Sequence, residues 1–381
     1  MIFFLVNNDY QLLDARHHAG ALKREGLAST LIEIPHKLAD APEVAEFAAR
    51  LRLASPVKLR GPARRWLGYR ASAREVANRL DPQATDVLFI YTEFELLNHL
   101  VAHRFKRAGA RVFIIEDGGV GTYIPFSLPS NEALSTREKI AAAMTRRLPG
   151  LRGTQFHKLN GIVFPWLADG QLDGLCTYRP LSIVRKIPVT VLAPPTRQKI
   201  SPRTGCVIFL NQPLYADYQT DEGYLQGLQQ IMQALQAGFD EVLFKFHPRE
   251  TDEWTTRIRS TLAEQAPRVR IIEETGPVET LLESTRPEAV ASFFSTTLLN
   301  LDGTGITPIF LYHLLPDLAS QTLMRQLTGL LQQWNYRFVT HWEDLRSGYD
   351  SGMAAEGDGI RLNLHDLITA APPVAASQEV N

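Results

Sequence analysis

The strongest constraint on the fold is a regular alternation of short apolar runs with helical stretches. Apolar runs at residues 1–6, 28–34, 86–91 and 111–115 are typical of buried strands. Strand, helix and strand in this rhythm imply parallel strands joined by right-handed crossovers. The helices predicted between or after these runs occupy residues 14–25, 41–53 and 95–108. The first half of the chain is therefore expected to form a doubly wound α/β domain.

A second alternation begins after a proline-rich break at Pro194-Pro195, where neither a helix nor a strand can continue. The predicted strands occupy residues 206–210, 241–246, 269–272, 289–294 and 308–312, and the predicted helices occupy residues 225–237, 253–265 and 278–283. The 381 residues suffice for two such domains. The predicted fold class is α/β, with two Rossmann-like domains, residues 1–193 and 203–345, facing a cleft. A tail, residues 346–381, is expected to pack back on the first domain.

Composition excludes several classes of protein. The formal net charge of -1 argues against nucleic-acid binding, and Cys176 and Cys206 show no metal-ligand spacing. The first apolar run is too short for a signal peptide, and no run approaches the roughly 20 residues of a spanning helix. We therefore expect a cytoplasmic protein, with peripheral contact to the inner face of the membrane as a further expectation.

That expectation depends on two basic segments. Residues 50–79 interleave cations with Trp66 and Tyr69, and residues 136–152 do so with apolar neighbours. Charge runs usually form solvated helical faces. The alternative is a surface that meets anionic lipid or an acidic glycan.

Three polar motifs follow predicted strands, where ligands of doubly wound domains bind. Glu116-Asp117-Gly118-Gly119 follows the strand at 111–115. A carboxylate there can act as a general base, and glycines let a ligand approach the backbone. The plain alternative is a polar turn whose acids are solvated or cap a helix.

The other two motifs follow strands of the second domain. Lys245-Phe246-His247-Pro248 places an imidazole beside cations, which suits a phosphate. The segment 292–297 (SFFSTT) opens a helix, and Ser295 or Thr296 can serve as its N-cap. Hydroxyls at a helix N-terminus also favour an anion.

The order of these motifs resembles that of the bacterial sialyltransferases, and most closely the polysialyltransferase and lipooligosaccharide sialyltransferase families. These enzymes carry an acid-acid-Gly motif in the first domain, then His-Pro and Ser-Ser or Ser-Thr motifs in the second. The resemblance implies the GT-B glycosyltransferase architecture. It also implies an inverting transfer of sialic acid or a related acidic sugar from a CMP donor to a hydroxyl of a surface glycan, such as capsule or lipooligosaccharide.

The resemblance also implies residue roles. Glu116 matches the general base, with Asp117 and Gly118 beside it. His247 matches the histidine that contacts the donor phosphate and assists the leaving CMP. The other residues expected to bind substrate are Asn211, Gln212, Lys245, Pro248, Glu273 or Glu274, Ser295 and Thr296. The two glutamates compete for the donor ribose.

No cofactor or metal is expected, because the phosphate makes CMP a good leaving group and no Asp-x-Asp motif is present. Three alternatives stay open: a CMP-Kdo-dependent transferase, a non-catalytic sugar-nucleotide-binding protein for polysaccharide assembly, and a sugar-nucleotide epimerase. The expected partners are the CMP-sugar donor and a glycan or glycolipid acceptor.

Overall fold

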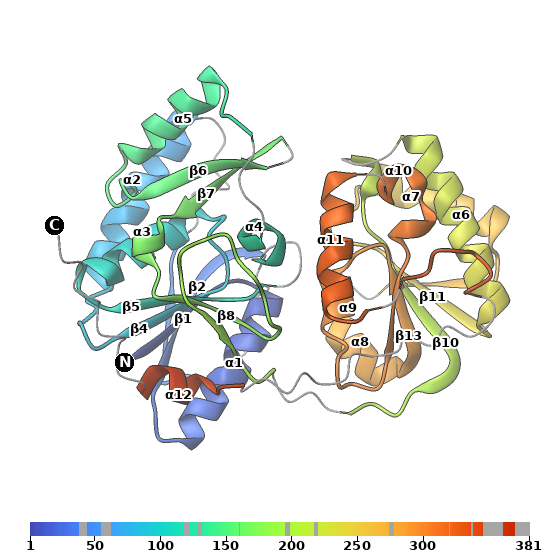
Figure 1. The fold of residues 1–381 in the computed structure, drawn as a ribbon, viewed down its shortest axis with the longest axis horizontal. Coiled ribbons are helices and arrows are strands. Elements are labelled where there is room, and N and C mark those ends of the chain that lie inside the picture. Colours follow the sequence, from blue (N-terminus) through green and yellow to red (C-terminus); the bar gives the residue numbers. More distant parts are fainter. Residues whose placement is uncertain are drawn as a thin grey trace. The chain divides into compact units, whose positions relative to one another are not determined.

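The chain divides into two compact units. The computed structural model describes residues 1–37, 44–54, 62–117, 122–127, 132–159, 161–194, 199–216, 220–273, 278–319, 321–336, 338–345 and 361–369 (Figure 1). Unit 1 comprises Met1–Asp117, Phe126–Pro195 and Gly359–Asn381, and unit 2 comprises Gly118–Pro125 and Thr196–Asp358. Within the expected first domain, residues 1–193, the segment Gly118–Pro125 clusters with unit 2.

Unit 1 contains a seven-stranded sheet whose neighbouring strands are all parallel. In spatial order the strands are β3 (Ala49–Arg52), β2 (Ser29–Lys37), β1 (Ile2–Asn8), β4 (Val87–Ile90), β5 (Arg111–Ile115), β8 (Gly174–Thr177) and β9 (Val189–Val191). The strand order reverses between β1 and β4, which is the switch point where doubly wound sheets bind ligands.

Apolar side chains cover both faces of this sheet. Helix α1 (Asp9–Arg24) buries Ala15 and Ala19 against Phe4 and Phe89. Helix α12 (Leu364–Thr369) adds Leu364 to the same cluster and lies next to α1 in Figure 1. On the other face, helix α3 (Leu96–Arg107) packs Phe105 against the β1 residue Phe3, with ring centroids 4.9 Å apart. The C-terminal segment therefore completes the core of unit 1.

Two parts of unit 1 differ from the sequence prediction. The helix expected over residues 41–53 is wrong over residues 44–53, the part that the structure describes. Residues 44–48 form a turn, and β3 then pairs with β2, where Arg50 forms an ion pair with buried Glu33. This edge pairing overrides local helix preference. The antiparallel hairpin of β6 (Thr154–Leu159) and β7 (Ile162–Leu167), and strands β8 and β9, were not predicted. The remaining helices are α2 (Pro62–Arg79), α4 (Ile124–Ser127) and α5 (Thr136–Arg146).

Unit 2 contains a five-stranded parallel sheet. In spatial order the strands are β12 (Val269–Ile272), β11 (Glu241–Lys245), β10 (Arg203–Leu210), β13 (Pro287–Ser292) and β14 (Thr307–Phe310). Relative to chain order this is 3-2-1-4-5, with the switch point between β10 and β13. The helices are α6 (Asp221–Gly238), α7 (Asp252–Gln265), α8 (Val278–Thr285), α9 (Thr296–Leu299), α10 (Pro316–Ala319) and α11 (Thr322–Gln333).

Candidate active site

Glu116 lies directly after β5, and the neighbouring strand β8 holds it in place. The Glu116 amide donates to the Cys176 carbonyl over 2.9 Å, and the Tyr178 amide donates to the Glu116 carboxylate over 2.6 Å. The Arg179 guanidinium lies 3.7 Å from this carboxylate. The Glu116 residue is only 1% exposed. A buried carboxylate requires such partners, and here they fix its orientation.

Asp117 is half-buried and is held from α1. The Gln11 side-chain Nε2 donates to its carboxylate over 2.7 Å, and the Gln11 side-chain Oε1 accepts from the Asn7 backbone amide, also over 2.7 Å. Burial raises the pKa of Asp117 to about 7, and the nearby Asp14 adds to this rise. Asp117 therefore exchanges a proton near neutral pH, where general acid–base groups work best.

Asp14 is the centre of a buried polar cluster that shares Tyr178 with Glu116. Its carboxylate accepts from the Tyr91 and Tyr178 hydroxyls, each over 2.8 Å. His18 Nε2 lies 2.7 Å from the Tyr178 hydroxyl, and burial lowers the pKa of His18. Tyr178 thus holds Glu116 with its amide and Asp14 with its hydroxyl. Through Tyr178, α1 and β8 position the acid pair together.

Two asparagines form hydrogen bonds at the switch point between β1 and β4. Asn98 donates to the side chain of Asn7 over 2.9 Å and to the Thr92 carbonyl over 2.8 Å. Asn7 donates back to Asn98 over 3.2 Å. Because the Asn7 amide also bonds Gln11, the end of β1 is connected to Asp117.

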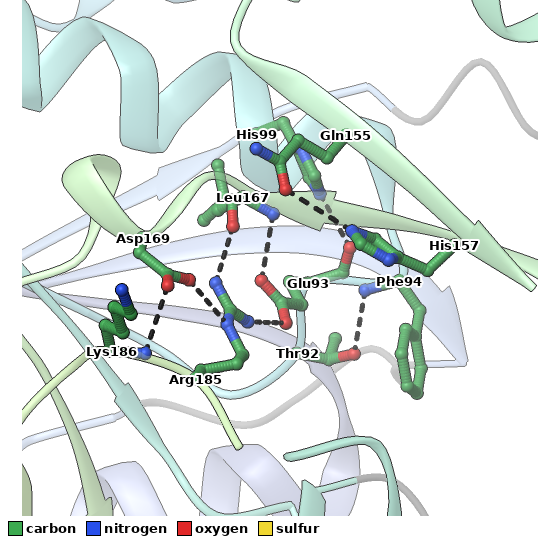
Figure 2. A network of polar contacts seen from close by, with 10 residues as sticks. All are labelled: Thr92, Glu93, Phe94, His99, Gln155, His157, Leu167, Asp169, Arg185 and Lys186. Atoms are coloured by element: carbon green, nitrogen blue, oxygen red, sulfur yellow. Dashed lines mark hydrogen bonds and ion pairs between the residues drawn. The ribbon is translucent and has the colours of Figure 1, made fainter. Parts of the chain in front are cut away.

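A second network ties the hairpin to the end of β4 (Figure 2). Buried Arg185 donates to Glu93, to Asp169 and to the Leu167 carbonyl, while Glu93 accepts from the Leu167 amide over 2.9 Å. Burial raises the pKa of Glu93 to about 7 although Arg185 opposes the rise. The Glu93 carbonyl contacts His99, whose pKa is lowered by burial to about 3. This network fixes β7 against the sheet.

The raised pKa of Asp117 leads to a pH-dependent stability. Folding favours the protonated form of Asp117. The resulting contribution to the free energy of unfolding is complete below the ordinary pKa of 3.8 and is lost as pH rises through about 7. Asp117→Asn cannot ionise and can still accept from Gln11. The free energy of unfolding of the variant should therefore exceed that of the wild type by more at pH 8 than at pH 5. The difference should grow by on the order of a few kcal/mol.

Urea unfolding at pH 5 and pH 8 measures this difference. The control is Asp81→Asn, because the Asp81 side chain is 90% exposed and should show no comparable trend. An advantage of Asp117→Asn that is equal at both pH values would mean that Asp117 titrates normally.

In unit 2, the turn after β10 contacts the turns after both neighbouring strands. Buried Asn211 donates to Glu250 over 2.7 Å, and Glu250 lies three residues beyond His247. Gln212 accepts from the Phe294 amide over 2.9 Å, directly before Ser295. The sequence-predicted residues on β10, β11 and β13 are therefore brought to one edge, at the switch point of the sheet.

His247 is half-buried, whereas Pro248 is exposed. The Arg249 amide donates to His247 Nδ1 over 3.1 Å, so the neutral ring carries its proton on Nε2. Lys245 is buried at the end of β11, and its carbonyl accepts from the Asn211 amide over 3.0 Å. This turn therefore presents an imidazole that can donate from Nε2, next to a lysine.

Ser295 caps α9 by accepting from the Thr297 amide over 3.3 Å, and Ser295 and Thr296 are both half-buried. Glu273 follows β12, one strand further along the edge. It is exposed and bound by Arg259 through two hydrogen bonds of 2.8 and 2.7 Å. Glu274 and Gly118 lie outside the described residues.

Glu250 was missed by the sequence analysis, although it follows the His-Pro motif directly. It accepts from Asn211 and from the Tyr215 hydroxyl, and burial raises its pKa. Tyr215 in turn stacks on Trp254, with ring centroids 3.7 Å apart. Glu250 thereby connects the turns after β10 and β11. In the described part of the chain, no group of three or more His, Cys, Asp or Glu residues could hold a metal ion.

The family model for alpha-2,8-polysialyltransferase (POLYST) matches residues 37–303. This range covers more than two thirds of the 381 residues and includes Glu116, His247 and Ser295. No curated protein matches the chain at a significant level of sequence similarity.

Solved structures resemble the chain in fold. A Listeria monocytogenes protein assigned as a UDP-N-acetylglucosamine 2-epimerase has a TM-score of 0.52 at 11% identity, with 91% of this chain and 85% of that chain covered. The UDP-GlcNAc 2-epimerase of Methanocaldococcus jannaschii has a TM-score of 0.51 at 11% identity, with 93% and 96% covered. At such identities the likeness concerns the fold alone. It agrees with the predicted GT-B class of two α/β domains with parallel sheets.

Proposed function

We propose that this chain, which belongs to the alpha-2,8-polysialyltransferase family, transfers sialic acid or a related acidic sugar from a CMP donor to a glycan hydroxyl. Membership of the family makes it a glycosyltransferase of the sialyltransferase kind. The donor, the inversion at the anomeric carbon and the surface-glycan acceptor are the proposed parts.

The observation that carries the donor proposal is that hydrogen bonds connect the turns after β10, β11 and β13 at the switch point of unit 2. His247 can donate from Nε2, and the hydroxyls of Ser295 and Thr296 come from the turn after β13. Gln212 connects this turn to β10. Imidazole and hydroxyl donors of this kind suit the phosphate of a nucleotide.

In the proposed reaction, the acceptor hydroxyl transfers its proton to Glu116 while its oxygen attacks the anomeric carbon. The bond between that carbon and the phosphate oxygen breaks, and CMP leaves with the electron pair. His247 donates to the leaving phosphate and stabilises its charge. The partners of Glu116, Tyr178 and Arg179, keep the base in one orientation.

Thermal unfolding with nucleotides tests the donor. CMP should raise the melting temperature, and UDP should raise it much less, because a ligand that binds the folded state stabilises it by mass action. Each nucleotide is added at matched millimolar concentrations, and release of CMP from CMP-sialic acid is measured in parallel. Equal shifts with UDP would contradict the assignment of a CMP donor and favour UDP-sugar chemistry.

A further inference from the structure

Helix α5 has apolar and cationic side chains on the face that is exposed in unit 1. Ala142 is its buried residue, whereas Ile140 and Met144 are 57% and 56% exposed. Ile140 and Met144 are four residues apart and share one helical face, roughly opposite Ala142. Packing within the described part of the chain does not explain large apolar residues at the centre of an exposed face.

Cations surround this apolar pair. The exposed basic residues on or next to α5 are Arg137, Lys139, Arg146 and Arg147. The acid in the first turn, Glu138, is occupied by the capping box with Ser135 and by an ion pair with Lys158. The exposed face is therefore positively charged and apolar at once, which is the composition of helices that lie in a membrane interface.

Helix α2 repeats this combination within unit 1. Trp66 and Leu67 are exposed, by 36% and 59%, and the Arg70 guanidinium lies 4.7 Å from the Trp66 ring centroid. Of the seven exposed large hydrophobic residues in the described part of the chain, four lie on α2 and α5. No described helix could cross a membrane.

We propose that the outward face of α5, formed by Arg137, Ile140, Met144 and Arg147, docks on an anionic lipid surface. The cations attract lipid headgroups, and the two apolar side chains enter the boundary between headgroups and acyl chains. A soluble acidic glycan would satisfy the cations but would leave Ile140 and Met144 in water. The apolar pair therefore favours lipid over glycan.

Vesicle flotation with the full chain tests this surface. Vesicles contain phosphatidylcholine alone or with about one third phosphatidylglycerol, an anionic lipid that gives the surface a negative potential. Arg137→Glu with Arg147→Glu should weaken partitioning to anionic vesicles by at least about 30-fold, the loss expected for two cations near the surface. The charge-matched control is Arg24→Glu with Arg107→Glu. These arginines also lie in terminal turns of helices and are exposed, so the same charge change there should have a much smaller effect.

The apolar pair is tested separately, because it distinguishes lipid from glycan. Ile140→Ser with Met144→Ser should weaken vesicle binding about tenfold or more, from lost apolar burial. The matched control is Leu13→Ser with Val184→Ser, which changes exposed apolar residues elsewhere in unit 1. Unchanged vesicle binding by the α5 serine variant would overturn the lipid proposal. Loss of binding only in the glutamate variant would instead mark a site for a soluble polyanion. Vesicle binding does not depend on sugar transfer, so this test is independent of the proposed function.

Discussion

Glu116→Gln should lower the rate of sugar transfer by about 10²–10⁴-fold, the usual contribution of general acid–base catalysis. Glutamine keeps the shape of the side chain and can still accept from the Tyr178 amide. Its amide cannot take a proton from the acceptor hydroxyl. CMP affinity should barely change, because Glu116 belongs to unit 1 and the proposed phosphate site belongs to unit 2. The measurements are the initial transfer rate at saturating donor and the CMP dissociation constant.

The matched variant is Asp117→Asn, which removes the neighbouring carboxylate and leaves the contacts of Glu116 in place. With Glu116 as the base, this variant should lose clearly less activity than Glu116→Gln. The reverse order would assign proton transfer to Asp117, whose pKa near 7 suits that task. A wild-type rate in both variants would remove the acid pair from the mechanism.

Much of the fold could be predicted because strands buried on both faces form continuous apolar runs. The strands predicted at residues 111–115 and 206–210 coincide with β5 and with the buried end of β10. No long-range information is needed to recognise such runs. The polar residues directly after them could be assigned to a sheet edge for the same reason.

Strand β8 could not be recognised in this way, and the partners of Glu116 were missed with it. Its four residues follow a hairpin instead of a crossover helix, so the alternation is interrupted there. The hairpin itself could have been predicted from the sequence, since Asn160-Gly161, a dipeptide typical of tight hairpin turns, separates two strand-like segments. Tyr178 and Arg179 reach Glu116 only because β8 pairs with β5, some 60 residues away in sequence.

The Asp14 cluster illustrates the same limit on α1. Asp14 and His18 are four residues apart on its buried face, where apolar residues are usual. That anomaly is visible in sequence, but its explanation is not. Tyr91 and Tyr178 come from the ends of β4 and β8, so the polar cluster exists only once the sheet has formed.

His247→Ala should reduce both transfer and CMP affinity, which separates its role from that of Glu116. Loss of a hydrogen bond to a charged phosphate should weaken CMP binding by about 10–100-fold. Transfer should fall further, by about 10²–10⁴-fold, because the leaving phosphate loses its donor. Calorimetric titration with CMP and initial transfer rates give the two quantities.

The matched control is His341→Ala, an exposed histidine in unit 2 that lies outside the three motifs. It should leave both quantities near wild type and so exclude a general effect of removing an imidazole. A His247→Ala variant that loses transfer but keeps CMP affinity would make the imidazole a proton donor without a binding role. Unchanged transfer and affinity would mean that the phosphate is held elsewhere. In that case the contacts of Gln212 and Glu250, which connect the turns beside His247, would serve folding alone.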